Sequence, residues 1–422
     1  RHGLLLMANP AAEEGEQSAV VEVYSLGGKL LAKLPRPAES SLTSLEEALN
    51  LQAEDDEDLG LVWRLAHSGP LGPEPLFATR EPLLQLQVHE LSDEIYALPS
   101  MYTQVRKMPQ FKNVHGSAVT EDGKPFPSRI LFRRTDASEL QMAERLYNEF
   151  MFLLIWRNEN FVVVQDLFVA PAASGGCWYC IFGYMETSMA AVLRSPMHLT
   201  ANHVDYFAYN ILRGLRFLHS LGFAHGSVCP SNVWLNANDD IQLSHLCFMH
   251  PADVPIADEA SIEVRDFYQG IAADLEWQHS RPLEVLESRS LGGAPGDMWA
   301  MGCFLVELLF RRRLLPGSDL EDQRRRIAQL DQALETLNPK VARVDIDFQE
   351  LEIRVETARG CLALPATSRL TAEAMIRASW LAELHAVDDG PTVSTKFSWR
   401  TFASFAELRV ALMSLRRAAE AH

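Results

Sequence analysis

The stretch His225-Gly226-Ser227-Val228-Cys229-Pro230-Ser231-Asn232 decides the fold, because of what stands on either side of it. Residues 200–220, just before it, have the apolar spacing of a helix with one buried face. The apolar positions of that face are Val204, Phe207, Ile211, Leu215 and Leu218. The run Val233-Trp234-Leu235, just after it, has the composition of a strand. The sequence therefore predicts a long amphipathic helix, a polar loop and a strand, in this order.

The spacing of this loop resembles the catalytic loop of protein kinases, whose pattern is H-R-D-L-x-x-x-N. His225 and Asn232 match the pattern, whereas Gly226 stands at the arginine position and Ser227 at the aspartate position. In kinases that aspartate accepts the proton of the substrate hydroxyl, and a neutral serine hydroxyl is not a base at pH 7. The resemblance implies a kinase fold with poor or no phosphoryl transfer.

The helix-forming run at 206–220 makes the resemblance more specific. It is strongly similar to the helix before the catalytic loop in mitogen-activated protein kinases, and further matches extend over about residues 95–420. The implied fold class is α+β, a two-lobed protein-kinase-like fold preceded by a small β-grasp domain. Its expected parts are an N-lobe at 92–186, a C-lobe at 187–391, and an extension at 392–422 whose helix packs on the N-lobe.

The expected N-lobe departs from the family at positions that face the nucleotide. Residues 109–114 replace the G-x-G-x-x-G loop without any of its three glycines, so side chains stand where the phosphates approach bare backbone. Arg133 takes the lysine position, and Glu149 matches the glutamate that pairs with that lysine. These two residues are expected to form a lobe-ordering ion pair, with an ordinary surface pair as the alternative. Phe182 falls at the gatekeeper position, where its bulk would fill the back of the nucleotide pocket.

Two further positions, in the expected C-lobe, lack the charged groups of the family. Cys229 replaces the lysine of the catalytic loop, and His245-Leu246-Cys247 replaces D-F-G. Magnesium prefers oxygen ligands, so His245 is a poor substitute for the metal-binding aspartate. Asn232 matches the magnesium-binding asparagine, and a turn-capping side chain is the alternative. We therefore expect neither a metal nor a cofactor.

Other matched positions predict that the packing of the fold is kept. Leu153, Leu246 and His225 match a column of side chains that ties the two lobes together in the family. Asp297 matches the aspartate that steadies the catalytic loop, and Arg369 matches an arginine near the end of the C-lobe. The A-P-E motif of the family is blurred, so the sequence leaves open whether Glu284 fills its glutamate position. Retained packing with lost chemistry is the pattern that the resemblance implies for a pseudokinase.

The segment at 19–91 carries no catalytic motif and follows a flexible N-terminus expected at 1–18. Its strand-like runs lie at 20–24, 30–34, 61–65 and 84–88. Gly27-Gly28 forms a hairpin signature between the first two runs, and S/T-x-x-E patterns predict a short helix at 43–49. This order resembles a ubiquitin-like β-grasp domain. An irregular extension that covers the next domain is the alternative.

The overall composition excludes several classes of partner. With 56 acidic and 38 basic residues, the net charge of −18 disfavours nucleic acid and anionic membrane surfaces and favours basic protein motifs. No apolar run reaches the roughly 18 residues that span a bilayer, so we expect no membrane insertion. The 6 scattered cysteines indicate a reducing compartment, and we expect a cytoplasmic protein, with association with the cytoskeleton as one option.

Asp388 and Asp389 form the candidate docking site for a protein partner. They match the acidic common-docking segment that binds basic linear motifs in mitogen-activated protein kinases, and plain surface charge is the alternative. Membership of a larger assembly as a subunit is a further expectation.

The sequence thus leads to an expectation about activity. We expect a catalytically inactive pseudokinase that is not an enzyme and acts as a scaffold or as a structural or allosteric subunit. This expectation rests on the joint departure of the glycine loop, the lysine, the catalytic aspartate and the metal-binding aspartate. The alternative is an atypical protein kinase with residual ATP binding and serine/threonine phosphotransfer.

Overall fold

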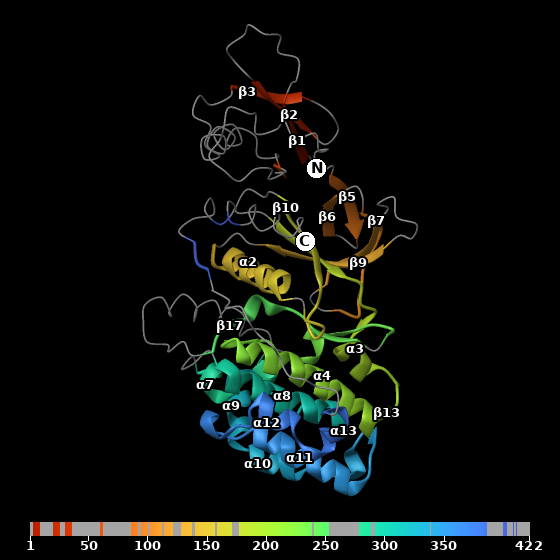
Figure 1. The fold of residues 1–422 in the computed structure, drawn as a ribbon, viewed down its shortest axis with the longest axis vertical. Coiled ribbons are helices and arrows are strands. Elements are labelled where there is room, and N and C mark those ends of the chain that lie inside the picture. Colours follow the sequence, from red (N-terminus) through yellow and green to blue (C-terminus); the bar gives the residue numbers. More distant parts are fainter. Residues whose placement is uncertain are drawn as a thin grey trace.

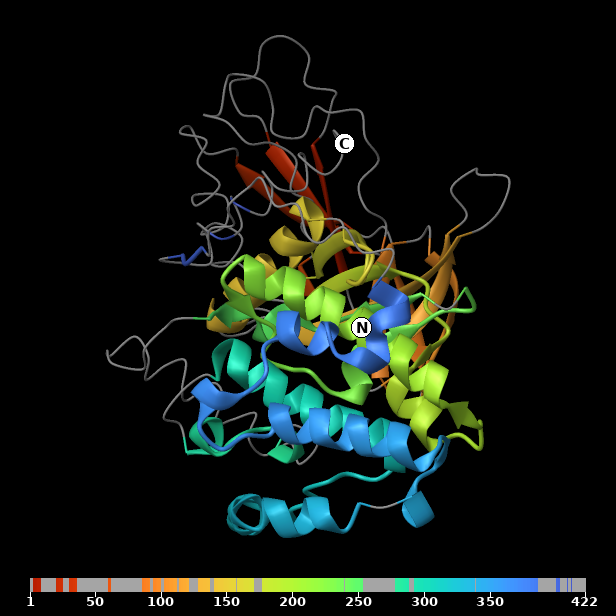
Figure 2. The same cartoon turned by 60° about the horizontal axis from the view of Figure 1, so that its bottom comes forward.

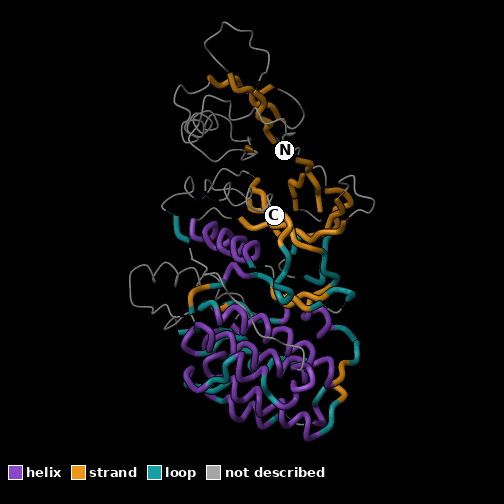
Figure 3. Tube along the Cα trace, viewed as in Figure 1, coloured by secondary structure: helices purple, strands orange, loops and turns teal. Residues whose placement is uncertain are grey.

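The computed structural model describes a set of ranges that covers most of the expected kinase-like region. These are residues 3–8, 20–25, 30–35, 60–61, 86–91, 94–99, 102–111, 114–120, 128–136, 140–156, 158–170, 177–238, 240–252, 278–287, 292–337, 339–385, 400–402, 408 and 411. Strands prevail in the earlier part and helices in the later part, as the colours of Figure 3 show. This division matches the two lobes of the predicted fold.

The N-lobe is built on a five-stranded sheet of order β10-β11-β9-β8-β7, in which every neighbouring pair is antiparallel. Its strands are β7 (Tyr102–Arg106), β8 (Gly116–Thr120), β9 (Ser128–Asp136), β10 (Val164–Ala170) and β11 (Cys177–Gly183). One helix, α2 (Leu140–Ile155), runs beside the sheet (Figure 1). The inner strand β9 pairs Arg133 with Cys180 of β11, which places both residues close to α2.

Polar contacts hold the outer side of α2 to the far end of the chain. Asn148 donates from Nδ2 to the Arg400 carbonyl at 2.9 Å and accepts the Arg400 amide at 3.0 Å. The Phe402 amide donates to Glu144 at 2.6 Å, and the Phe402 ring packs edge-on against Tyr147 at 4.9 Å. Residues 400–402 of the predicted C-terminal extension therefore pack on the N-lobe. Most of the helix predicted after them lies outside the described residues.

The C-lobe is helical, and its core is formed by α4 and α8. The helices are α3 (Met189–Arg194), α4 (Ala201–Ser220), α7 (Leu283–Leu286), α8 (Gly293–Phe310), α9 (Leu320–Ala328), α10 (Leu330–Glu335), α11 (Phe348–Cys361), α12 (Ala372–Ile376) and α13 (Ala382–His385). The predicted helix at 200–220 is confirmed, with Thr200 and His203 forming a capping box at its start. Helix α8 is buried on nearly all sides, which explains its almost continuous apolar sequence. In Figure 2 the blue helices of the last part of the C-lobe lie in front of the other helices.

A buried ion pair joins α11 to α4. Arg354 donates to both carboxylate oxygens of Asp205, at 2.8 and 2.6 Å, and its guanidinium lies 5.1 Å from the ring centre of Trp380. Such a bidentate pair also fixes the orientation of the two helices. Burial raises the pKa of Asp205 above its ordinary value in spite of Arg354.

Short strands position the loop at 225–232 between the lobes. A three-stranded sheet of order β12-β15-β16 joins β12 (Thr187–Ser188), β15 (Val233–Leu235) and β16 (Ile241–Leu243), so the loop enters a strand as predicted. Two further pairs join β13 (Leu199–Thr200) to β18 (Val344–Asp345) and β14 (Phe223–Ala224) to β17 (His250–Pro251). The loop begins directly after β14 and ends at β15.

The N-terminal strands form a separate sheet of order β3-β2-β1-β4. They are β1 (Gly3–Ala8), β2 (Val20–Ser25), β3 (Leu30–Pro35) and β4 (Gly60–Leu61). The predicted hairpin is present, because β2 and β3 pair antiparallel. Strand β1 pairs with β2 although it lies in the segment predicted as a flexible N-terminus. The continuous apolar run at 3–8 thus has a partner strand within this segment.

A second hairpin crosses the predicted boundary at residue 91. Strand β5 (Leu86–Leu91) pairs antiparallel with β6 (Glu94–Pro99), from Leu86 opposite Pro99 to Leu91 opposite Glu94. The strand predicted at 84–88 therefore belongs with the residues that follow it. The predicted helix at 43–49 and most of the strand at 61–65 lie outside the described residues, and the remaining domain boundaries stay predictions.

Candidate functional site

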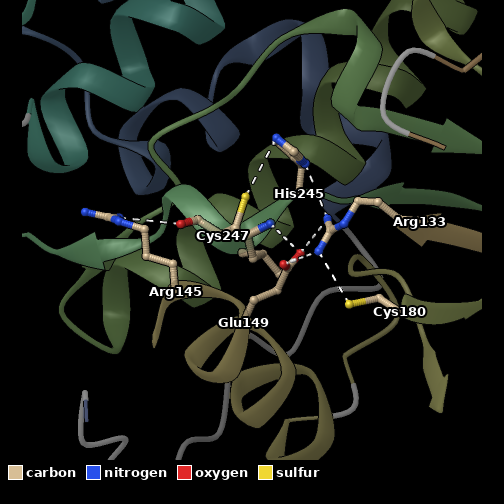
Figure 4. A network of polar contacts seen from close by, with 7 residues as sticks. Arg133, Arg145, Glu149, Cys180, His245 and Cys247 are labelled. Atoms are coloured by element: carbon tan, nitrogen blue, oxygen red, sulfur yellow. Dashed lines mark hydrogen bonds and ion pairs between the residues drawn. The ribbon is translucent and has the colours of Figure 1, made fainter. Parts of the chain in front are cut away.

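The interlobe site begins with a buried ion pair between β9 and α2. Arg133 donates from Nη1 to Glu149 Oε1 at 3.1 Å and from Nη2 to Oε2. Both side chains are almost fully buried, with exposures of 4% and 2%, so this is not the surface pair that the sequence left as an alternative. Burial by itself would lower the pKa of Arg133, but Glu149 outweighs it and the pKa lies above its ordinary value. The pair fixes the helix against the sheet (Figure 4).

The ion pair continues into the segment that replaces D-F-G. The amide of Leu246 donates to Glu149 Oε1 at 3.0 Å, and Arg133 Nη1 lies 3.3 Å from His245 Nδ1. A guanidinium only donates, so Nδ1 is the acceptor and the neutral ring carries its proton on Nε2, which lies 3.7 Å from Cys247 Sγ. Figure 4 shows His245 and Glu149 on the two sides of the Arg133 guanidinium. The residues at the lysine and metal-binding aspartate positions thus contact each other directly.

Two buried thiols complete the surroundings of Arg133. Its Nη2 lies 3.7 Å from Cys180 Sγ, and Arg145 of α2 reaches the carbonyl of Cys247 at 3.5 Å. Burial raises the pKa of the Cys180 thiol to about 11 and that of Cys247 also above its ordinary value. Both thiols are therefore protonated at pH 7 and act as packing groups, not as nucleophiles.

Asp297, which is buried near the start of α8, hydrogen-bonds the backbone of the loop at 225–232. Its Oδ2 accepts the His225 amide at 2.7 Å and its Oδ1 accepts the Gly226 amide at 2.9 Å. His219 of α4 donates from Nε2 to Oδ2 at 2.9 Å. Burial alone would raise the pKa of Asp297, but the hydrogen bond and charge of His219 hold it below its ordinary value. The structural role that the resemblance implies for Asp297 agrees with this geometry.

Ser227 and Asn232 face each other inside the loop. Asn232 donates from Nδ2 to both the carbonyl and the Oγ of Ser227, each at 2.8 Å. The Ser227 amide donates to His225 Nδ1 at 3.1 Å, and burial lowers the pKa of His225 to about 4, so its ring is neutral at pH 7. Asn232 thus closes the loop, as in the turn-capping alternative. Cys229 lies at the same loop, half-buried, just before the short helix Pro230–Asn232.

The backbone conformation at residue 226 explains why a glycine stands at the arginine position of the pattern. Gly226 has a φ of +73°, and a Cβ at this position would lie 2.4 Å from the Phe248 carbonyl. Its own carbonyl accepts a hydrogen bond from Arg281 Nη2, so an arginine from a distant segment anchors the loop. Only glycine fits this conformation and this close approach.

Leu153, Leu246 and His225, which the resemblance places in a column between the lobes, are all buried. Their exposures are 4%, 0% and 0%, and both leucines share one continuous apolar core with Leu167 of the sheet. The packing role that the resemblance implies for these residues therefore has a physical basis. Leu246 fills an apolar slot, and its amide at the same time hydrogen-bonds Glu149.

An aromatic cluster lies beside Arg133, between β11 and β15. Phe182, at the end of β11, packs edge-on against Trp234 of β15 with ring centres 5.5 Å apart. Phe111, from the segment that replaces the glycine loop, packs against the same indole at 5.3 Å. All three rings are almost fully buried, and the Arg133 guanidinium lies 5.4 Å from the Phe182 ring. We call Phe111, Phe182 and Trp234 the aromatic cluster.

The replaced glycine loop is tied to the segment that links the lobes. Gln110 donates from Nε2 to the Glu186 carbonyl at 2.9 Å, and Ser188 donates from Oγ to the Gln110 carbonyl at 2.6 Å. These two contacts hold Phe111 over Trp234. The Phe111 ring is therefore fixed against Trp234, next to the segment that links the lobes.

Arg369 resolves the question that the sequence left open for Glu284. It donates to both carboxylate oxygens of Glu284, at 2.6 and 3.1 Å, and stacks over Trp299 at 5.0 Å. Glu284 thus pairs with the matched arginine in spite of the blurred motif. Helix α7, which carries Glu284, is thereby fixed to the C-lobe.

Sequence reasoning missed several residues that build this site. They are Phe111, Arg145, His219, Trp234 and Arg281. Trp234 gave a usable signal, because a large aromatic directly after Asn232 in a short buried strand must pack against something across the cleft. The other four act through partners that are distant in the sequence, so no local pattern reveals them.

The donors present do not fit a magnesium ion held as in kinases. His245 Nδ1 is engaged by Arg133, and the carboxylate of Glu149 is engaged by Arg133 and the Leu246 amide. In the described ranges, no group of three or more His, Cys, Asp and Glu side chains is arranged to hold a metal ion. We therefore derive no step through a protein-held metal.

Two other predictions concern a docking site for protein partners and insertion into a membrane. Asp388 and Asp389, the candidate docking residues, lie outside the described residues. Within the part of the chain that the structure describes, no helix combines the length and apolar character needed to cross a membrane.

Comparison with known proteins agrees with the architecture. The model of the protein kinase domain family matches residues 114–381, which is more than half of the chain. The chain belongs to the protein kinase family. Among similar proteins, "Mitogen-activated protein kinase 13" of Arabidopsis thaliana is 28% identical over 277 residues, covering 61% of this kinase and 73% of its own length. "Mitogen-activated protein kinase 4a" of Physcomitrium patens is 29% identical over 302 residues, covering 67% and 74%.

These findings correct the expectation that the chain is not an enzyme. A protein kinase family match and relatives named as mitogen-activated protein kinases point to a protein kinase enzyme. The expectation failed because it treated substitutions at single positions as loss of function. Phosphoryl transfer depends mainly on positioning and electrostatics, so such substitutions change its rate without deciding the family or its activity.

Proposed function

We propose that this chain is an atypical kinase of the mitogen-activated protein kinase type, which binds ATP between its lobes and slowly transfers phosphate to serine or threonine hydroxyls. In this reaction the bond between the terminal phosphorus and ADP breaks, and a bond to the acceptor oxygen forms. The acceptor proton leaves to solvent or to a phosphate oxygen. Relatives named as mitogen-activated protein kinases support the substrate class.

One observation carries this proposal: a continuous set of buried contacts joins the sheet, α2 and the loop at 225–232. Glu149 joins Arg133 of the sheet to the amide of Leu246, and Asp297 holds the two amides at the start of the catalytic loop. Such a framework lowers the entropic cost of placing a nucleotide and an acceptor in line. The cation of Arg133 then supplies positive charge at the phosphate end of the cleft.

The expected rate is low because position 227 has no carboxylate. A positioned base typically contributes about 10²- to 10⁴-fold to a rate, and the Ser227 hydroxyl, bonded to Asn232, orients an acceptor but does not take its proton. The rings of the aromatic cluster must also move apart before the adenine ring of ATP can enter beside Phe182. Low activity and a gated nucleotide site are thus two aspects of the same proposal.

The test measures binding and transfer separately. In a thermal unfolding assay, ATP with and without magnesium should raise the midpoint of the full chain, and Arg133→Met, which removes the cation, should reduce this rise. With radiolabelled ATP and a basic serine/threonine peptide, Ser227→Asp should increase transfer by about 10²- to 10⁴-fold. Ser318→Asp, which adds the same charge at an exposed position, is the matched control and should leave transfer unchanged.

Failure of both measurements would reject the proposal. The decisive result is that neither the natural chain nor Phe111→Leu responds to ATP, and that Ser227→Asp transfers no label. Because Phe111→Leu loosens the aromatic cluster, it separates a closed nucleotide site from one that does not bind ATP at all.

A second candidate function is binding of protein partners that act on the kinase through α2. The observation that favours it is the clasp of Arg400 and Phe402 on Asn148, Glu144 and Tyr147, next to the helix that carries the lobe-ordering glutamate. We propose that partners with basic motifs dock at Asp388 and Asp389, near this clasp in sequence. In this scaffold or allosteric role, the kinase is one subunit of a larger assembly.

We further propose a ubiquitin-like fold for the N-terminal segment, supported by the β2–β3 hairpin and the adjoining strand β1. Pull-down with the full chain and with a chain that starts at residue 84 tests both ideas. The shorter chain keeps the β5–β6 hairpin whole and should lose only partners of the N-terminal segment. The double variant Asp388→Asn with Asp389→Asn should bind a basic peptide more weakly than the natural chain, and the difference should shrink at high salt. Equal binding by the natural chain and the double variant would reject the docking site.

A further inference from the structure

A cavity of about 290 Å³ lies in the C-lobe, away from the interlobe site. It is enclosed by the end of α4, the start of α8 and the segment that leads into α12, and α4 packs directly against α12. The lining residues are Arg216, His219, Ser220, Ala294, Pro295, Met298, Arg369, Leu370, Thr371, Ala372 and Glu373. Helices α4, α8 and α12 are labelled in the lower half of Figure 1.

The cavity wall combines an apolar body with a cationic edge. Pro295, Met298 and Leu370 supply apolar surface, while Arg216 and Arg369 oppose the single acidic side chain of Glu373. Positive character is unusual in a chain of net charge −18. The volume is at the lower end of the range for small-molecule pockets, which are mostly apolar with a few placed polar groups.

The two arginines of the wall have different roles. Arg369 is committed to the fold, since it donates to Glu284, to the Pro295 carbonyl at 3.1 Å and to the Ala363 carbonyl at 2.9 Å. Arg216 Nη1 lies 3.7 Å from Glu373 Oε2, a longer distance than that of a hydrogen-bonded pair.

Glu373 has a better partner than Arg216. Arg377, one turn further along, donates from Nε to Glu373 Oε1 at 2.7 Å. An anion that binds Arg216 therefore leaves Glu373 paired with Arg377, and no charge is stranded. Binding of an anion to Arg216 thus exchanges its 3.7 Å contact with Glu373 for a contact with the anion.

We propose that this cavity binds a small amphipathic carboxylate, with its apolar chain against Met298 and Leu370 and its carboxylate on Arg216. The same cavity touches the anchor of the catalytic loop. His219, which lines it, donates to Asp297, and Asp297 holds the His225 amide. A ligand in the cavity therefore contacts the side chain that donates to Asp297.

The test uses octanoate as the probe and 1-octanol as its uncharged match, with the full chain and isothermal calorimetry. Octanoate should bind the natural chain, and Arg216→Gln should weaken it about 10- to 100-fold while leaving 1-octanol unchanged, because a charge-assisted hydrogen bond is lost. Arg213→Gln is the matched control, since Arg213 lies one turn earlier on α4 and pairs with Glu159. It should not change binding of either probe.

Ala294→Trp fills the cavity from the first turn of α8 and should abolish binding of both probes. A measurement on the unaltered chain covers the case in which this variant does not fold. With methyl-labelled methionine, octanoate should shift the Met298 methyl resonance, identified by its absence in Met298→Leu. Absence of octanoate binding, binding that persists in folded Ala294→Trp, or an unmoved Met298 resonance at saturation would each overturn the proposal.

Discussion

The two faces of the interlobe region differ in how closely they follow the kinase family. The face that supports backbone and lobe packing is held by buried contacts, with Asp297 on the loop amides, Glu149 on Arg133, and Leu153 and Leu246 in the apolar core. The face where the resemblance places the nucleotide carries Phe111, Phe182, Trp234 and His245. There the aromatic cluster and the contact between His245 and Arg133 take the space and the hydrogen bonds of a ligand.

This difference shows that the two sets of residues answer to different physical demands. A buried carboxylate that holds several amides is not replaceable without leaving donors unsatisfied, so the supporting face tolerates little change. A side chain that would contact a ligand needs only packing and hydrogen-bond partners of its own within the protein. Arg133 shows both demands at once, because it keeps the ion pair of the family lysine and finds a new acceptor in His245.

The largest effect is expected when the supporting face is broken at Arg133. Arg133→Met leaves the Glu149 carboxylate buried without its countercharge, which should cost about 3–5 kcal/mol of unfolding free energy. Urea unfolding measures this loss. Adding Glu149→Leu should restore most of it, because the stranded charge is removed. Arg359→Met, which breaks an exposed pair with Asp331, should cost at most about 1 kcal/mol, and an equal loss in both variants would contradict the contrast.

A somewhat smaller loss is expected for Asp297→Asn. The amide turns one acceptor into a donor that faces amides or the His219 N–H, so at least one charge-assisted hydrogen bond is lost, costing about 1.5–3 kcal/mol. Urea unfolding and faster hydrogen exchange at the Gly226 amide are the measurements. Asp331→Asn on the exposed surface is the control. Unchanged exchange at Gly226 would show that Asp297 does not hold the loop.

The supporting face should also make stability depend on pH. Burial lowers the pKa of both His225 and His250 to about 4, whereas the unfolded value is about 6.5. Unfolded chains take up protons first as pH falls, so this stability is complete above pH 6.5 and is lost between pH 6.5 and 4. At pH 5 the loss should be roughly 2 kcal/mol for each histidine. Unfolding at pH 8 and pH 5 measures it, and a His225→Asn variant should show a shallower dependence.

The nucleotide-facing side should give the smallest effect. Phe111→Leu keeps apolar volume but removes the ring contact with Trp234, which is worth about 0.5–1.5 kcal/mol. Opening the cluster should therefore tighten ATP binding about 2- to 10-fold, as measured by titration calorimetry. Phe207→Leu, a similar truncation on α4, should leave ATP binding unchanged. Weaker binding in Phe111→Leu would show that the ring supports the nucleotide instead of covering its site.

Much of the fold could be predicted from local patterns. The apolar spacing at 200–220 predicts α4, and the matched positions predict the pairing of Arg133 with Glu149 and the role of Asp297. The helix was predictable because its apolar spacing is local, and the two contacts because the resemblance matches both partners in each case. The pairing of Glu284 with Arg369 could not be predicted, because the motif around Glu284 is blurred and only the folded chain brings the two together.

The sequence by itself determined the kinase fold and predicted the ion pair of Arg133 with Glu149, because periodicity and residue type act locally. Only the tertiary structure decided that Phe111, Phe182 and Trp234 close over one another and that Arg281 anchors Gly226. It also decided that Arg216 and Met298 share the wall of a cavity. Each of these contacts joins segments far apart in the chain, and their proximity follows from packing, which no single stretch of sequence encodes.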